Sequence, residues 1–204
     1  SEKAAGRYAR LPRLIKQMLK QLSVVAAQSK DDAARFISSG ANPENVVTTG
    51  SLKFDREINH SVFERGEALR RELGVNRFVF MAGSTREGEE EILLDAFEMA
   101  KDKTSGLLMI IAPRHPERFN VVADLLTKRA IPFCRQQDNR IVDATIKVFL
   151  LDVMGELTNY YAASDVAYVG GSLMPYGGHN TLEPAGLGVP IVSGPHTYNF
   201  DEIN

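Results

Sequence analysis

Short apolar segments alternate with amphipathic ones over most of the chain, from residue 77 to residue 194. The apolar segments read RFVFMAG, LLMIIAP, IPFC, TIKVFLL, DVAYVGG and PIVSG. Helical spacing of apolar residues marks the longer segments between them, at 87–100, 116–130, 155–164 and 181–187. Continuous apolar strands that alternate with amphipathic helices are typical of a parallel sheet covered on both faces. The sequence therefore predicts an α/β fold with a parallel sheet.

Residues 1–50 show a shorter βαβ pattern, in which SVVAAQS and NVVTTG flank the helical stretch DDAARFISSG. Upstream, apolar residues recur at helical spacing and would form one face of a helix: Leu11, Leu14, Ile15, Met18, Leu19 and Leu22. Basic side chains lie on the opposite face. A basic amphipathic helix can lie on an anionic lipid surface. The simpler interpretation is a helix that packs its apolar face on a core.

Charge, cysteine content and hydropathy exclude several classes of protein. The formal net charge of −2 argues against a nucleic-acid binder, which usually carries a basic excess. The single cysteine, Cys134, rules out an intramolecular disulfide and is too few for a structural zinc site. No apolar run approaches the roughly 20 residues of a membrane span, so we expect a soluble chain. Because the sequence begins with Ser1 rather than methionine and ends at Asn204 directly after the stretch YNFDEI, we also expect it to be a piece of a longer protein.

Four polar stretches follow predicted strands, and each could carry chemistry. They read AGSTREGEEE, APRHPERF, LDVMGEL and GGHNTLEP. In open α/β sheets, ligands bind beyond the carboxyl ends of the strands, so these stretches would meet at one rim. Their convergence predicts a nucleotide site there.

The first two stretches offer groups for an anion and a base. Ser84 and Thr85 can donate to an anion at a helix start, or they can simply cap the helix. Arg114 ends an apolar strand and needs an anionic partner, either a ligand phosphate or an acidic side chain. The carbonyl of Pro113 can pair with the edge of a base. His115 is a secondary candidate, because it can equally be a structural hydrogen-bonding group.

The third stretch offers open backbone at a helix start. Gly155, between Met154 and Glu156, would let a phosphate or a base carbonyl approach the free N–H groups of the first turn. Alternatively, this glycine only makes the turn. In the fourth stretch, Gly177 and Gly178 would clear space for a ligand.

The fourth stretch also contains a carboxylate near a helix start. Asn180 and Glu183 have the spacing of a capping box, but Pro184 prefers the first helical position. That preference moves the expected N-cap to Glu183, with Thr181 and Leu182 just before it. A carboxylate there can accept hydrogen bonds from both hydroxyls of a ribose.

These motifs together resemble the Kdo transferases, which add 3-deoxy-D-manno-octulosonic acid (Kdo) to lipid A precursors in lipopolysaccharide biosynthesis. The resemblance covers essentially the whole chain and rests on SEKAAGRYARLP, TGSLKFD, AGSTREGEE, APRHPERF, MGELTNYYAASDVAYVGGSL, GGHNTLEPAGLGVPIVSGP and NFDEI. It implies a GT-B glycosyltransferase with two Rossmann-like domains. Residues 1–50 would end the N-terminal acceptor domain, and residues 51–204 would form a truncated C-terminal domain that binds CMP-Kdo.

The resemblance also implies a reaction. Kdo would pass from CMP-Kdo to lipid IVA with inversion and without a metal or other cofactor, at the cytoplasmic face of the inner membrane of a Gram-negative bacterium. Lys53 resembles the position that stabilises the transition state, although on residues alone it could be a surface lysine. Because the family's general base would precede Ser1, we expect this chain to bind the donor weakly and to catalyse no transfer. The motifs that would contact CMP are Pro113–Arg114, Met154–Glu156 and Asn180–Glu183.

Two other functions stay open at this point. A GT-B enzyme that uses a UDP-sugar would need more positive charge for its second phosphate, and a non-catalytic nucleotide-binding module would need no acceptor. The sequence argues against a dehydrogenase, because no strand is followed by Gly-x-Gly-x-x-Gly. The sequence does not predict an oligomeric state.

Overall fold

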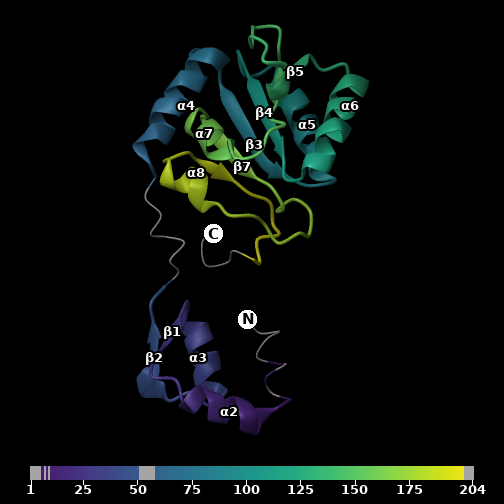
Figure 1. Cartoon of the computed structure of the whole chain (residues 1–204). Coiled ribbons are helices and arrows are strands. Elements are labelled where there is room, and N and C mark those ends of the chain that lie inside the picture. Colours follow the sequence, from purple (N-terminus) through teal and green to yellow (C-terminus); the bar gives the residue numbers. More distant parts are fainter. Residues whose placement is uncertain (1–5, 7, 9, 51–57, 200–204) are drawn as a thin grey trace. The chain divides into compact units, whose positions relative to one another are not determined.

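The computed structural model describes residues 6, 8, 10–50 and 58–199, which fall into two compact units, residues 1–57 and residues 58–204. Each unit is described by itself (Figure 1). Their assignment to an acceptor and a donor domain stays a prediction. No helix in the described part of the chain is long and apolar enough to span a bilayer.

Unit 1 is built on two parallel strands, β1 (Val25–Ala27) and β2 (Val46–Thr48), which pair in the register Val25 to Val46. Helix α3 (Lys30–Ser38) connects them, and the short 3₁₀ helix η1 (Pro43–Asn45) leads into β2. The hydroxyl of Ser29 caps α3 by accepting a hydrogen bond from the Asp32 N–H. The predicted βαβ pattern is therefore confirmed.

Helix α2 (Pro12–Lys20) precedes this βαβ unit and exposes most of its apolar side chains. Leu14 is 61% exposed and Met18 is 49% exposed, whereas Leu19 is buried. The prediction that this apolar face packs on a core is therefore wrong for the part of unit 1 that the structure describes.

Unit 2 contains a six-stranded parallel sheet in the order β5-β6-β4-β3-β7-β8. In the central pair, Met81 of β3 lies beside Ile110 of β4, and on its other side β3 pairs Met81 with Ala167 of β7. The strands are β3 (Val79–Thr85), β4 (Leu108–Pro113), β5 (Phe133–Arg135), β6 (Val148–Leu150), β7 (Val166–Val169) and β8 (Ile191–Val192).

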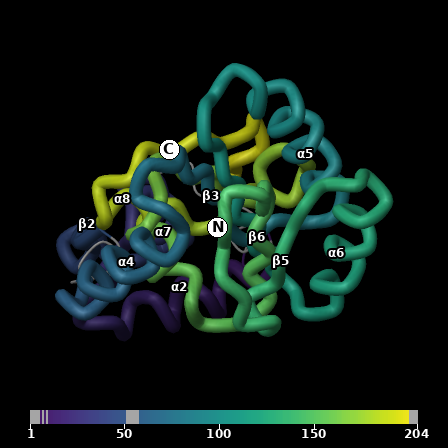
Figure 2. The backbone as a smooth tube through the Cα atoms, turned by 90° about the horizontal axis from the view of Figure 1, so that it is seen from above, coloured from purple at the N-terminus to yellow at the C-terminus, as the bar shows by residue number. Residues whose placement is uncertain are grey.

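Helices cover both faces of this sheet, as Figure 2 shows from above. Because side chains along a strand alternate between faces, Met81 packs under α4 and α7, and Ala82 packs under α5 and α6. Helix α8 packs beside α7. The helices are α4 (His60–Leu73), α5 (Glu89–Ala100), α6 (Phe119–Lys128), α7 (Leu157–Ala162) and α8 (Leu182–Gly186), with short 3₁₀ helices η3 (Pro116–Arg118) and η4 (Gln136–Asp138).

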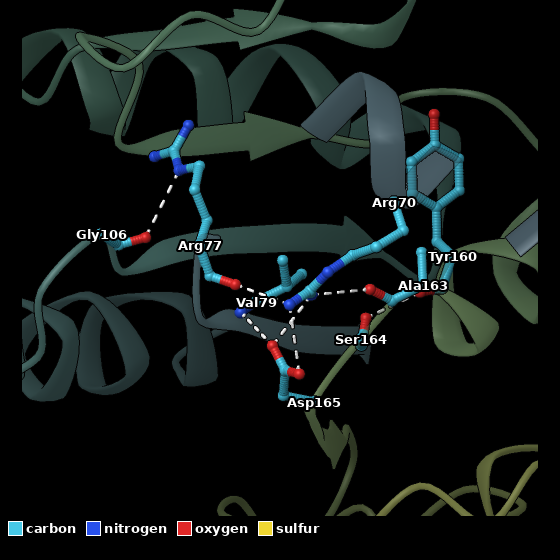
Figure 3. A network of polar contacts seen from close by, with 8 residues as sticks. All are labelled: Arg70, Arg77, Val79, Gly106, Tyr160, Ala163, Ser164 and Asp165. Atoms are coloured by element: carbon cyan, nitrogen blue, oxygen red, sulfur yellow. Dashed lines mark hydrogen bonds and ion pairs between the residues drawn. The ribbon is translucent and has the colours of Figure 1, made fainter. Parts of the chain in front are cut away.

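A polar network fixes the amino ends of the central strands (Figure 3). Arg70 of α4 donates to both carboxylate oxygens of Asp165, at 2.9 and 3.2 Å, and also to the carbonyl of Arg77. Asp165 in turn accepts the backbone N–H of Val79 at 2.7 Å. One carboxylate therefore joins α4 to the starts of β3 and β7, and the opposite ends of these strands are left to form the rim.

Candidate nucleotide site

The carboxyl ends of β3 and β4 and the starts of α7 and α8 surround a hollow of about 230 Å³. Seven side chains from four separate stretches line it: Ser84, Arg114, Leu157, Tyr161, His179, Asn180 and Glu183. The predicted convergence at one rim is therefore seen for Ser84, Arg114, Asn180 and Glu183. Lys53 lies outside the described residues.

The end of β3 bends at Ser84, whose backbone is left-handed with a φ of 55°. The next residue, Thr85, is fully buried, and its hydroxyl donates to Glu90. Helix α5 begins only at Glu89, after Gly88 with a φ of 85°. The alternative that Ser84 and Thr85 cap this helix is therefore wrong, and Thr85 is not among the side chains that line the hollow.

Two glutamates of α5 face the interior and support the rim. Glu89 is fully buried and accepts from the Tyr168 hydroxyl at 2.6 Å and from the Gly171 N–H at 2.8 Å. Glu90 accepts two hydrogen bonds from Arg118, both at 3.1 Å, while burial raises its pKa. These carboxylates are occupied by protein donors, and their sequence spacing alone did not indicate this role.

Arg114 stands at the end of β4, where its N–H donates to the Thr85 carbonyl. Its side chain is exposed. The expectation that a buried Arg114 needs an anionic partner is therefore corrected, because water can solvate this guanidinium. No ion pair to its guanidinium is found among the described residues, so the alternative of a structural salt bridge is not seen there. Pro113 beside it is buried as the last residue of β4. The Nε2 atom of His115 lies 2.8 Å from an Arg86 nitrogen.

The stretch from Met154 to Glu156 lies beside the hollow without lining it. Gly155 has a φ of 88°, and a Cβ there would meet no atom within 4 Å. Met154 is 60% exposed. Helix α7 begins at Leu157, with Glu156 as the N-cap residue, so the predicted start at Gly155 is wrong. Of the residues from Met154 to Leu157, only Leu157 lines the hollow, and the approach of a ligand to the Gly155 backbone stays a prediction.

Helix α8 begins at Leu182 with Thr181 as its N-cap, which corrects the expected N-cap at Glu183. The Asn180 side-chain oxygen accepts a hydrogen bond from the Leu182 N–H at 3.1 Å. Part of the hydrogen-bonding capacity of this amide is therefore used within the turn. Glu183 is half-buried, lines the hollow and accepts from the Thr158 hydroxyl at 3.1 Å. Burial, and then the Glu183 charge, raise the pKa of the neighbouring Tyr161.

The glycines before this turn do not all clear space for a ligand. A Cβ on Gly177 would come within 2.2 Å of the Asn199 side chain, so protein already fills that space. His179, which sequence reasoning overlooked, lines the hollow, and its buried Nε2 atom has no hydrogen-bond partner in the described structure. Burial lowers its pKa, and the nearby charges of Arg114 and Arg86 lower it further.

A larger hollow of about 360 Å³ lies elsewhere in unit 2, among α4, α7 and the segment after β5. Arg65, Arg135 and Arg140 line it, and it contains none of the residues predicted to bind a nucleotide. Size alone therefore does not select the functional site. Across the described residues, no group of three His, Cys, Asp or Glu side chains is placed to hold a metal ion.

Comparison with known proteins agrees with the sequence resemblance. The family model described as 3-deoxy-D-manno-octulosonic-acid transferase (kdotransferase) matches residues 1–56. The 3-deoxy-D-manno-octulosonic acid transferase of Haemophilus influenzae is 40% identical over 203 residues, which cover all of this chain and 48% of that protein. The chain thus spans about half the length of the curated relatives it matches.

Solved structures show the same relationship. The crystal structure of the C-terminal CMP-Kdo binding domain of WaaA from Acinetobacter baumannii has a TM-score of 0.67 and 37% identity, over 71% of this chain and 76% of that one. Anabaena Alr3699/HepE in complex with UDP and glucose has a TM-score of 0.51 and 17% identity, over 97% of this chain and 51% of that one, and shows the fold alone. The α/β fold of the GT-B class is confirmed. The chain belongs to the Kdo transferase family.

Proposed function

We propose that the complete enzyme transfers Kdo from CMP-Kdo to the lipid A precursor lipid IVA, with inversion and without a metal. The relatives are named Kdo transferases, and the related Acinetobacter domain is named for binding CMP-Kdo. Within this chain, unit 2 binds the donor, and unit 1 belongs to the acceptor domain. The reaction takes place at the cytoplasmic face of the inner membrane of a Gram-negative bacterium.

One observation carries the donor site: Arg114, Asn180 and Glu183, from distant parts of the chain, line one hollow. CMP has a single phosphate, and a guanidinium binds a phosphate through two parallel hydrogen bonds. Arg114 is available for this, since its guanidinium makes no ion pair among the described residues. Glu183 accepts the ribose hydroxyls, and the open backbone at Gly155 lies beside the base.

Two further parts of the proposal concern the acceptor side. Lys53 neutralises the charge that develops on the departing CMP phosphate. Helix α2 presents exposed Leu14 and Met18 together with Arg13 and Lys16, a composition that suits an anionic lipid surface. The acceptor, a phosphorylated lipid, would present such a surface.

Calorimetric titration of CMP into this chain tests the donor site. We expect binding, and a Glu183→Ala variant that loses at least about tenfold in affinity, because charge-assisted hydrogen bonds to the ribose hydroxyls disappear. Asp124→Ala is the matched control, since Asp124 is an exposed carboxylate on α6. Comparable losses from both variants, or tighter binding of UDP than of CMP, would contradict the assignment.

A further inference from the structure

A second arginine, Arg86, follows the end of β3 and contacts His115, the neighbour of Arg114, although Arg86 does not itself line the hollow. One of its terminal nitrogens lies 2.8 Å from His115 Nε2, and its guanidinium carbon lies 4.4 Å from the centre of the Tyr176 ring. Because a guanidinium can only donate, His115 accepts through Nε2 and carries its proton on Nδ1. Arg86 is therefore held between an imidazole and an aromatic face, with several N–H groups still available.

Two guanidinium groups lie in this part of the rim: Arg114 lines the hollow together with the carboxylate of Glu183, and Arg86 lies behind it against His115. Arg118 and Arg135 of unit 2 are ion-paired with Glu90 and Asp152, whereas the partly buried Arg77 donates to backbone carbonyls. Arg86 and Arg114 have no such pair among the described residues. Both nonetheless lie near enough to His179 to lower its pKa, after the larger effect of burial.

The carboxylate near Arg86 does not satisfy its guanidinium. Glu89 accepts the backbone N–H of Arg86 at 2.9 Å and the N–H of Gly171 with the same oxygen. Its other oxygen accepts from Tyr168 and Leu173. With both oxygens occupied, Glu89 lowers the local positive charge but leaves the guanidinium fork without an anion.

We propose that Arg86 binds the carboxylate of the donor sugar, while Arg114 binds the phosphate, and that His115 positions Arg86. This inference rests on the proposed function and names a specificity-determining residue for the same site. Kdo is an octulosonic acid, so CMP-Kdo carries a carboxylate in addition to its phosphate. A planar guanidinium fork pre-oriented by His115 and Tyr176 matches a carboxylate with two parallel hydrogen bonds.

The test separates the sugar acid from the nucleotide. CMP is first brought to saturation on the chain, and then free Kdo or its methyl ester is titrated and followed by NMR. We expect the wild-type chain to prefer Kdo over the ester by about tenfold or more, the value of a charge-assisted pair of hydrogen bonds. In Arg86→Gln the preference disappears while the affinity for CMP stays within about twofold.

Arg140→Gln is the matched control, because it removes the same charge from the other hollow of unit 2. It should keep both the CMP affinity and the preference for the acid. The wild-type comparison of acid with ester uses no substitution, so it stands even if a variant folds poorly.

The failures of the two proposals are distinguishable. If CMP does not bind the wild-type chain, the nucleotide site and the carboxylate subsite fall together. If CMP binds but Kdo and its methyl ester bind equally well, only the carboxylate subsite at Arg86 is refuted. If Arg86→Gln weakens CMP as much as it weakens Kdo, Arg86 serves the phosphate and the assignment is overturned.

Discussion

Replacing Asp165 with alanine should destabilise unit 2 more than its partial exposure suggests. Asp165 accepts the N–H of Val79, a fully buried residue at the start of β3, and two hydrogen bonds from Arg70. Without the carboxylate, the Val79 N–H loses its partner in the interior, which costs about 1–3 kcal/mol.

The arginine side of the network contributes less. Arg70 keeps its hydrogen bonds to the carbonyls of Ala163 and Arg77, and its side chain is partly open to water. Loss of the charge pair therefore adds about 1 kcal/mol after solvent screening. The total expected for Asp165→Ala is about 2–4 kcal/mol.

Urea unfolding followed by near-ultraviolet circular dichroism measures the loss in the free energy of unfolding. The buried rings of Tyr160, Tyr161 and Tyr168 all report on unit 2. The matched control is Asp95→Ala, which breaks the surface ion pair with Arg129 and should cost less than about 1 kcal/mol. Equal losses in the two variants would refute the role given to Asp165.

Two further predictions concern stability. Because burial lowers the pKa of His179, the unfolded chain takes up a proton that the folded chain resists as the pH falls below about 6.5. Stability should therefore decline over that range, and His179→Gln should show a smaller decline in melting temperature; identical pH profiles would contradict this. Gly83→Ala should cost several kcal/mol, since its Cβ would come within 2.0 Å of the Tyr161 hydroxyl. Gly155→Ala should cost about 1 kcal/mol from its positive φ alone, and thermal melts that reverse this order would exclude the explanation.

The sequence predicts the sheet and its rim because these follow from local patterns. The end of β4 at Pro113 could be read directly from its apolar run, whereas β3 continues two residues past the predicted end at Gly83, to Thr85. The convergence of Arg114 and Glu183 follows from parallel topology, which brings the carboxyl ends of all strands to one edge.

What the sequence could not predict depends on long-range contacts. Glu89 stands in a run of glutamates at a helix start, yet it is fully buried and accepts from the Tyr168 hydroxyl and the N–H of Gly171, which lie far along the chain. The exposure of Arg114 and the filling of the space at Gly177 by Asn199 also depend on tertiary packing. The helix starts at Glu89 and Leu182 lie two residues and one residue after the predicted starts, which is the usual spread for helix ends.

The most direct test of the central claim is NMR mapping of CMP on the isotope-labelled chain. Binding at the proposed site should shift the resonances of Ser84, Arg114, Asn180 and Glu183 together, with those of Gly155 beside them. Shifts confined to Arg65, Arg135 and Arg140 would place the nucleotide in the larger hollow and contradict the account.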